Sequence, residues 1–419
     1  MEQNKEKDIQ NTIKSLQEKS DYIEKLLEKG NDVIIFQFGS HSIKYGFANE
    51  IVPRKIRTVI AYKHPDPPKN LYPQKLEEID IDAQLTALEA ALRKKGNIKG
   101  DVSNFKVKQK NRIEIPAPYK NAARPESLAR EDIFFEDDVY IPENLPGYVL
   151  RYPIRYGVLN VSESYTYEQV MADLQKLVYF ILKNKLMIKQ ADYSKYSIIL
   201  VIPDIFHRMH IKGLINLFLK NFGFAALYPH QESVLATFGL CVSQACVVDI
   251  GSDKINICCV DEGTVMPQTL IRKHFGMRDT EAVLYKLIQK KQNITYFTKN
   301  LKLDCTFLSD WSQIEKLKEL AYNFVQVEET ANNTYEGTLM RERPETFVIT
   351  GSEAFNIAPA SFFAADLLNT LKFRELINEK FLNFTSRYFT EYFDIEDYDD
   401  YSKKIFSSVR FSTNLSLFH

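Results

Sequence analysis

The chain has 419 residues, 45% of them hydrophobic and 26% charged, so it can bury a large core and is expected to form two domains or one bilobal unit. Its formal net charge of −1 argues against a protein that coats nucleic acid with its whole surface. The longest apolar run, Ile198 to Pro203, is too short to span a bilayer, and residues 1–30 are too charged for a signal peptide, so we expect an intracellular protein without a membrane partner.

The chain starts with a helical pattern, which a hairpin pattern follows. Residues 1–30 carry isoleucine and leucine at helical spacing among lysine, glutamate and glutamine, which predicts an amphipathic arm. A surface helix packed on its own domain and an arm that binds a partner agree equally well with this spacing. Residues 33–47 form an apolar strand, a Gly39-Ser40 turn and an alternating strand, which together predict a β-hairpin. Residues 52–62 add a third strand.

A basic window lies between Arg93 and Arg130, where eleven Lys or Arg residues stand against three acidic ones. The acidic stretch at 131–138 cancels much of this charge, so composition favours a solvated insertion at about residues 90–130. The alternative is contact with the DNA backbone, because each neutralised phosphate releases counterions and adds affinity. The candidate DNA-binding residues are Arg93, Lys94, Lys95, Lys106, Lys108, Lys110 and Arg112.

After this window, predicted strands and helices alternate along the chain. Strands are expected at 152–160 and 197–202, and helices at 165–187 and 207–222. Alternation of this kind predicts a mixed sheet that is covered by helices. The expected fold class is therefore α/β.

A second hairpin, at residues 246–260, repeats the first one at a constant offset. Gly39 matches Gly251, and Ile43 matches Ile255. Two such Gly-Ser turns facing each other would present backbone N–H groups and hydroxyls from both sides of a cleft, which suits a chain of phosphates. The repeat predicts two related half-domains around a nucleotide cleft.

The rest of the chain contains two helical patterns, at 280–291 and 311–324, and an acidic tail. Six acidic residues among the ten at 391–400 are typical of a mobile segment. The expected organisation is a helical arm at 1–30, a first half at 31–151 that contains the basic insertion, a second half at 152–378 and a mobile acidic tail at 379–419.

Four segments resemble motifs of the actin superfamily, in the family's order. Residues 38–48 resemble its first phosphate loop, 249–253 its second, 152–157 its Tyr-Pro-Ile-x-x-Gly segment, and 317–319 its adenine-side Lys-Glu. The resemblance implies an actin-like, bilobal ATPase fold made of ribonuclease-H-like, duplicated βββαβα halves. It implies ATP as a structural cofactor and the nucleotide-binding residues Gly39, Ser40, His41, Lys44, Asp249, Ile250, Gly251, Ser252, Asp253, Lys318 and Glu319. It also implies Asp249 as a residue that could hold Mg through water.

Finer features resemble one branch of the superfamily, the nuclear actin-related proteins. The segments 200–205, 230–234, 246–251 and 302–305 carry this resemblance. It implies a nuclear, non-filament-forming subunit of an ATP-dependent chromatin remodeller of the inositol-requiring-80 class, with a role in transcription regulation and DNA repair. The implied partners are a helix of the remodeller's motor subunit, actin, another actin-related protein, and DNA or the nucleosome.

The chain departs from the family where hydrolysis needs a metal ion and an oriented water molecule. Gln37 stands where the first loop usually has an aspartate, and His41 replaces a glycine. The water-orienting glutamine aligns with Glu232, or with Gln231 if the register slips by one residue, and the family histidine aligns with Asn256. We therefore expect ATP binding without efficient turnover, with Glu232 as the one weak catalytic candidate.

Two alternatives remain open at this point. Asp249 and Lys44 could form a salt link across an empty cleft. The protein could also be an active ATPase or small-molecule kinase of the actin, sugar-kinase and heat-shock-ATPase superfamily, with Glu232 or Asp253 over the γ-phosphate. The resemblance reaches about residue 360 without the family's third, Gly-Gly nucleotide loop, so the C-terminal portion of the fold is expected to be incomplete.

Overall fold

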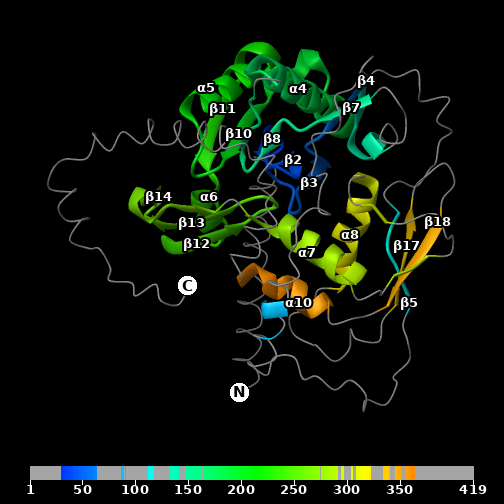
Figure 1. Ribbon diagram of the computed structural model, residues 1–419. Coiled ribbons are helices and arrows are strands. Elements are labelled where there is room, and N and C mark those ends of the chain that lie inside the picture. The colour runs from blue at the N-terminus through cyan, green and yellow to red at the C-terminus, as the bar shows by residue number, and fades with distance from the viewer. Residues whose placement is uncertain are drawn as a thin grey trace, which may run out of the picture.

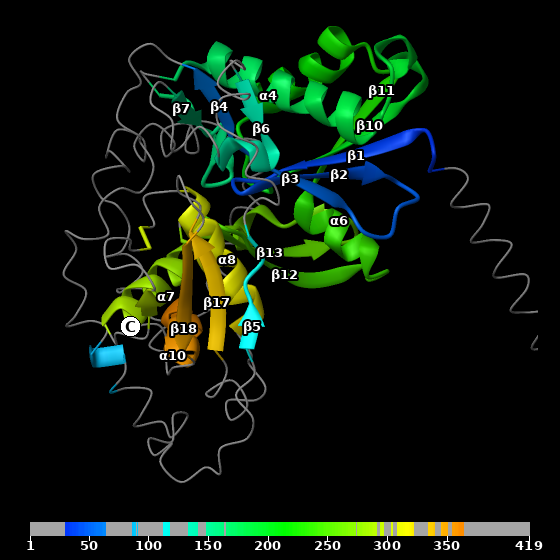
Figure 2. The same cartoon turned by 90° about the vertical axis from the view of Figure 1, so that its right-hand side faces the viewer.

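Two lobes, each with its own sheets and hydrophobic core, lie one above the other (Figures 1 and 2). The computed structural model describes residues 30–63, 86–88, 90, 112–117, 133–140, 148–162, 165–273, 275–290, 294–296, 303–304, 308–321, 334–339, 345–350 and 354–363. The predicted N-terminal arm, the acidic tail and most of the basic insertion lie outside these ranges.

A five-stranded sheet forms the centre of the first lobe. Its strands, in order, are β11 (Ala226–Gln231), β10 (Ser197–Ile202), β1 (Val33–Phe38), β2 (Ser42–Phe47) and β3 (Arg54–Arg57). β10 runs parallel to β1 and β11, whereas β2 is antiparallel to both of its neighbours. Burial alternates along β1 and β10, because successive side chains point to opposite faces of the sheet.

Two helices cover one face of this sheet, as Figure 2 shows. α4 (Tyr167–Phe180) begins at a capping box in which Thr166 and Gln169 satisfy each other's backbone N–H groups, and it continues as a π-helical turn (Ile181–Lys185). α5 (Arg208–Asn216) continues in the same way (Leu217–Phe222) and ends at Gly223, whose φ of 79° suits glycine. A 3-10 helix (Gln190–Lys195) precedes β10. Both predicted helices are confirmed.

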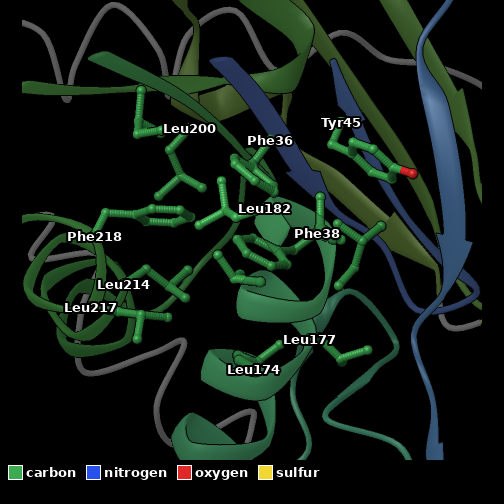
Figure 3. Packing of buried hydrophobic residues seen from close by; sticks show 14 of the residues in the cluster. Phe36, Phe38, Tyr45, Leu174, Leu177, Leu182, Leu200, Leu214, Leu217 and Phe218 are labelled. Carbon is green, nitrogen blue, oxygen red and sulfur yellow. The ribbon is translucent and has the colours of Figure 1, made fainter. Parts of the chain in front are cut away.

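Aromatic and aliphatic side chains fill the space between sheet and helices (Figure 3). Phe36 is fully buried, and the centroid of its ring lies 5.3 Å from that of Phe218. Leu174 of α4 and Leu214 of α5 close the same cluster from the helix side. This core fixes β1, and hence the turn that follows it, in a rigid frame.

A smaller antiparallel sheet packs beside the first one. Its strands, in order, are β6 (Ile133–Phe135), β4 (Ile60–Lys63) and β7 (Tyr148–Arg151). A 3-10 helix (Glu136–Tyr140) follows β6, and the hairpin β8 (Ile154–Arg155) and β9 (Val158–Leu159) follows β7. The single strand expected at 52–62 is wrong, because Thr58 turns the chain there and the segment forms two strands, β3 and β4, in different sheets.

Among the described residues, the second lobe holds two four-stranded sheets and three helices. The first sheet contains β12 (Gln244–Ile250), β13 (Ile255–Asp261), β14 (Thr264–Val265) and β15 (Ile271–Lys273). The second has the order β16 (Ile294–Tyr296), β18 (Glu345–Thr350), β17 (Thr334–Leu339) and β5 (Arg112–Glu114). The helices are α7 (Met277–Lys290), α8 (Leu308–Ala321) and α10 (Ala354–Ala360), and short 3-10 helices span Pro267–Thr269 and Ser361–Phe363. α6 (Glu232–Gly239) leads from β11 of the first lobe into β12 of the second.

The predicted duplication of the hairpins is present in the structure. Phe38 pairs with Ile43 across β1 and β2, and Ile250 pairs with Ile255 across β12 and β13, so each hairpin closes with the same number of turn residues. The surroundings of the copies differ. β1 has a parallel neighbour, β10, whereas β12 pairs with β13 alone among the described strands. The boundary between the two predicted halves lies at 151/152. β1 precedes it and β10 follows it along the chain, and the two strands share one sheet.

Candidate functional site

The first loop, residues 39–42, is a tight turn whose backbone is held by a hydrogen bond within the loop and by Thr58, the residue that follows β3. The Gly39 N–H donates to the carbonyl of Ser42 at 3.1 Å, and the Thr58 hydroxyl donates to the carbonyl of Gly39 at 2.7 Å. The Thr58 N–H donates to the carbonyl of His41 at 3.0 Å. A Cβ atom on Gly39 would lie only 2.8 Å from the Ser42 carbonyl, so the turn needs glycine there.

The second loop, residues 251–254, closes in the same way and also meets the start of α7. The Gly251 N–H donates to the carbonyl of Lys254 at 2.9 Å. The carbonyls of Gly251 and Ser252 accept from the N–H groups of Met277 and Arg278, each at 3.0 Å. Gly276 makes this approach possible, because a Cβ atom on it would lie 2.5 Å from the Gly251 carbonyl. The position of the second loop therefore depends on α7.

The turn Tyr156-Gly157, between β8 and β9, contacts both loops. The Gly157 N–H donates to Ser40 Oγ at 2.9 Å, and the Asp253 carboxylate accepts from the backbone of Tyr156. Both turn residues have positive φ, 52° and 71°. The segment was predicted as a motif from the sequence, without a role for either residue. The structure shows that they bring the first and the second loop together.

The last residue of the second loop, Lys254, is a buried lysine. Its ammonium donates to Glu232 Oε1 and, at 3.1 Å, to Asp249 Oδ2. Asn256 Nδ2 donates to the same Glu232 oxygen at 2.9 Å. Gln231 instead donates to the backbone carbonyl of Asp204 at 3.3 Å. Glu232, and not Gln231, therefore belongs to the cluster of Lys254, Asp249 and Asn256. The salt partner of Asp249 in the structure is Lys254 rather than Lys44.

Arg272 supports this cluster from β15. Its Nε donates to Asn256 Oδ1 at 2.9 Å, and its Nη2 donates to the carbonyl of Ile205 at 2.7 Å. Burial lowers the pKa of Arg272 to about 10, although nearby carboxylates oppose this change. Burial raises the pKa of Glu232, and the charge of Lys254 opposes that rise. The carboxylate thus lies in a place where its negative charge depends on nearby cations.

An ion pair joins the two lobes next to the first loop. Arg57 of β3 pairs with Glu315 of α8, and His41 Nδ1 lies 3.4 Å from the same carboxylate. Burial alone would raise the pKa of Glu315, but Arg57 and His41 outweigh it and lower that pKa to about 2. Burial lowers the pKa of His41 to about 4. His41 is therefore neutral at pH 7, and Arg57 is the main charged partner there. Neither Arg57 nor Glu315 was predicted from the sequence.

The remaining candidates lie in different surroundings. Lys44 is exposed on β2 opposite Gln37, and Ile250 is exposed at the end of β12. Lys318 donates to buried Glu281 at 2.6 Å in the interface of α7 and α8, whereas Glu319 is exposed.

Within the basic insertion at about residues 90–130, the structure describes residue 90 and residues 112–117. Arg112 lies on β5 and pairs with Glu336 of β17, so this charge is already neutralised within the second lobe. Arg93, Lys94, Lys95, Lys106, Lys108 and Lys110 lie outside the described residues.

The loops suit a phosphate chain, but the donor set does not suit a divalent cation. The two Gly-Ser turns, with the Ser40 hydroxyl and the loop N–H groups, are the type of concave backbone that binds anions. Mg needs free carboxylate oxygens, but Asp249 and Glu232 share the ammonium of Lys254. The described residues also contain no group of three His, Cys, Asp or Glu side chains arranged to hold a metal ion.

Comparison with known proteins identifies the family. The family model described as Actin matches residues 28–337. The "Probable actin-related protein 8" of Schizosaccharomyces pombe is 28% identical over 380 residues, which cover 80% of this chain and 54% of that protein. Actin-related protein 8 of Homo sapiens is 28% identical over 307 residues, which cover 67% of this chain and 48% of that protein. The chain spans about half the length of these curated relatives.

A solved structure, "Human actin-related protein Arp8 in its ATP-bound state", matches with a TM-score of 0.65 and 22% identity, over 81% of this chain and 70% of that chain. The predicted α/β, actin-like fold is confirmed. Within the described ranges, none of the helices has the length and the apolar character needed to cross a bilayer.

Proposed function

The chain belongs to the actin family, and on this basis we propose that it is a nuclear, non-filament-forming subunit of an ATP-dependent chromatin remodeller. In this proposal it holds ATP in the cleft as a structural ligand, without efficient hydrolysis. It binds DNA or the nucleosome, a helix of the motor subunit, actin and another actin-related protein of the inositol-requiring-80 class of complexes. Its similarity to actin-related protein 8 from yeast and human supports this assignment.

One observation carries the nucleotide part of the proposal: both Gly-Ser loops contact the same Tyr156-Gly157 turn. This arrangement places the hydroxyl of Ser40 and the backbones of both loops at one site. Backbone N–H groups and hydroxyls from two turns are donors that a triphosphate can use. The solved structure with the matching fold is described as ATP-bound, which agrees with this use of the loops.

The contacts of Glu232 argue against efficient hydrolysis. A general base must accept a proton from the attacking water. Glu232 already accepts from Lys254 and Asn256 on one oxygen, and its side chain is 10% exposed. Gln37 adds no charge to the site. The retained loops and the engaged carboxylate together favour binding over turnover.

Calorimetric titration of the full chain with ATP tests the nucleotide part. We expect saturable binding and a turnover indistinguishable from a protein-free blank. In this proposal exposed Lys44 of β2 contacts the phosphates, so Lys44→Met should weaken binding at least about tenfold. Lys212→Met on α5, an exposed lysine away from both loops, is the matched control and should bind like the wild type. Steady-state turnover that Glu232→Ala abolishes would instead establish an active ATPase.

Duplex DNA binding at increasing salt tests the chromatin part. Anisotropy of a labelled duplex should show affinity that falls steeply with salt. Changing Lys106, Lys108 and Lys110 together to Glu should reduce the slope of log K against log salt by about 3, since each phosphate contact contributes about 0.9. Absence of DNA retention at low ionic strength, together with no binding to the motor subunit's helix, would refute this part.

A further inference from the structure

An ammonium group lies between the two acidic side chains of the candidate site, Glu232 and Asp249. Lys254 Nζ donates to Glu232 Oε1 and to Asp249 Oδ2. These two contacts use two of the three N–H bonds of the ammonium, so the third can donate to a phosphate oxygen. The side chain of Lys254 is 10% exposed, whereas that of Asp249 is 35% exposed, so the cluster opens to solvent on the side of Asp249.

The turn that joins the two loops keeps Lys254 in this place. A Cβ atom on Gly157 would lie 2.5 Å from Lys254 Cδ and 2.7 Å from its Cε, so the stem of the lysine runs directly over the glycine. The backbone carbonyl of Lys254 also closes the second loop by accepting from Gly251. One residue thus sets the shape of the loop and puts a positive charge beside it.

The partner Glu232 is held equally firmly. It is the first residue of α6, and Asn256 donates to it, while Arg272 donates to Asn256 and to the carbonyl of Ile205. The chain of contacts therefore runs from β15 through β13 to the start of α6 and ends at the ammonium. A built network of this kind does not leave Lys254 free to move away without exposing buried charge.

The charges of this network have a consequence for the ligand. A triphosphate next to two uncompensated carboxylates would be repelled, so such a site needs a cation. Lys254 and Arg272 supply two positive charges to Asp249 and Glu232, whereas a further carboxylate nearby, Asp204, accepts from Ser233. A divalent ion at Asp249 would have to displace the ammonium or lie against it.

We propose that the ammonium of Lys254 takes the place of a divalent cation, so that this cleft binds nucleoside triphosphate in its metal-free form. The inference rests on the proposed nucleotide binding and adds the ionic form of the ligand. It makes Lys254 a positioning and specificity residue, and it makes Asp249 a partner of that lysine rather than a metal ligand.

Calorimetric titration with ATP in EDTA and in excess Mg tests this inference. For the wild type, the two dissociation constants should agree within about threefold. Lys254→Met should weaken binding in EDTA at least about tenfold, and Mg should restore much of it, because two carboxylates are then available to the ion. Lys254→Arg keeps the charge and should stay insensitive to metal.

Failure of the inference and failure of the proposed function give different results. Wild-type binding that needs Mg would overturn the inference and leave the nucleotide site in place. No binding in either buffer would refute the proposed function itself. If Lys254→Met does not fold, Asp249→Asn decides: it should change binding by the same factor with and without Mg, and a loss confined to the Mg buffer would make Asp249 a metal ligand.

Discussion

Replacing Arg57 by methionine should loosen the junction of the two lobes. Arg57 comes from β3 of the first lobe and Glu315 from α8 of the second, and their side chains are 14% and 9% exposed. The substitution removes the cation and leaves a carboxylate in a buried place. Such one-sided loss is more damaging than loss of the whole pair, because the remaining charge keeps its desolvation penalty.

The size of the effect follows from the pKa of Glu315. That pKa falls from 4.5 to about 2, against the rise that burial alone would cause. A change of this size corresponds to about 3 kcal/mol for Arg57, His41 and Arg278 together. Breaking one side of a buried pair costs about 3–5 kcal/mol. Arg278 also faces Glu315 and stays in the variant, so we expect the lower end, about 3 kcal/mol.

Urea unfolding followed by the fluorescence of Trp311 measures this effect. Trp311 is the one tryptophan of the chain, and it lies buried on α8 one turn before Glu315. The midpoint for Arg57→Met should fall clearly, and the double variant with Glu315→Gln should recover part of the loss. Lys195→Met is the control and should leave the midpoint unchanged, because that pair is exposed. An Arg57→Met midpoint equal to that of the control would refute the reasoning.

Three further predictions concern pH, the core and the second loop. The pKa of His41 is lowered from 6.5 to about 4 in the folded protein, so unfolding takes up a proton in this window and stability falls as the pH drops from 6.5 to 4. His41→Gln should flatten that part of the curve of urea midpoint against pH, and an unchanged curve would contradict the assignment. Phe218→Ala should cost about 3–5 kcal/mol in urea unfolding, whereas Phe363→Ala, at an exposed site, should stay within about 0.5 kcal/mol. Gly276→Ala should weaken ATP binding in the calorimeter, because its Cβ atom would collide with carbonyls of the second loop; unchanged affinity would show that this contact is not needed.

Local patterns predicted much of the fold. The alternating residues of β1 and β2, and the glycine of the turn between them, identified a hairpin that the structure confirms. The helical spacing of apolar residues likewise predicted α4 and α5. The break at Thr58 was not, because the β-branched residues around it suit one long strand, and only the contacts of Thr58 with the first loop show that the chain turns.

The site was predictable only in outline. The sequence identified the two loops, but it did not predict a role for Lys254 in the second loop, because the neighbouring residues do not show where the end of a long side chain will lie. Arg57 and Glu315 were missed for a different reason. They are 258 positions apart along the chain, and no periodicity connects β3 with α8.

The sequence by itself determined the α/β class, the duplicated hairpins and the family resemblance, because strand and helix periodicity and turn chemistry depend on residues a few positions apart. Only the tertiary structure decided which charges meet. It placed Lys254 between Asp249 and Glu232, and it joined the lobes through Arg57 and Glu315. The physical reason is that a buried charge is stable only beside a partner, and the packing of distant segments selects that partner.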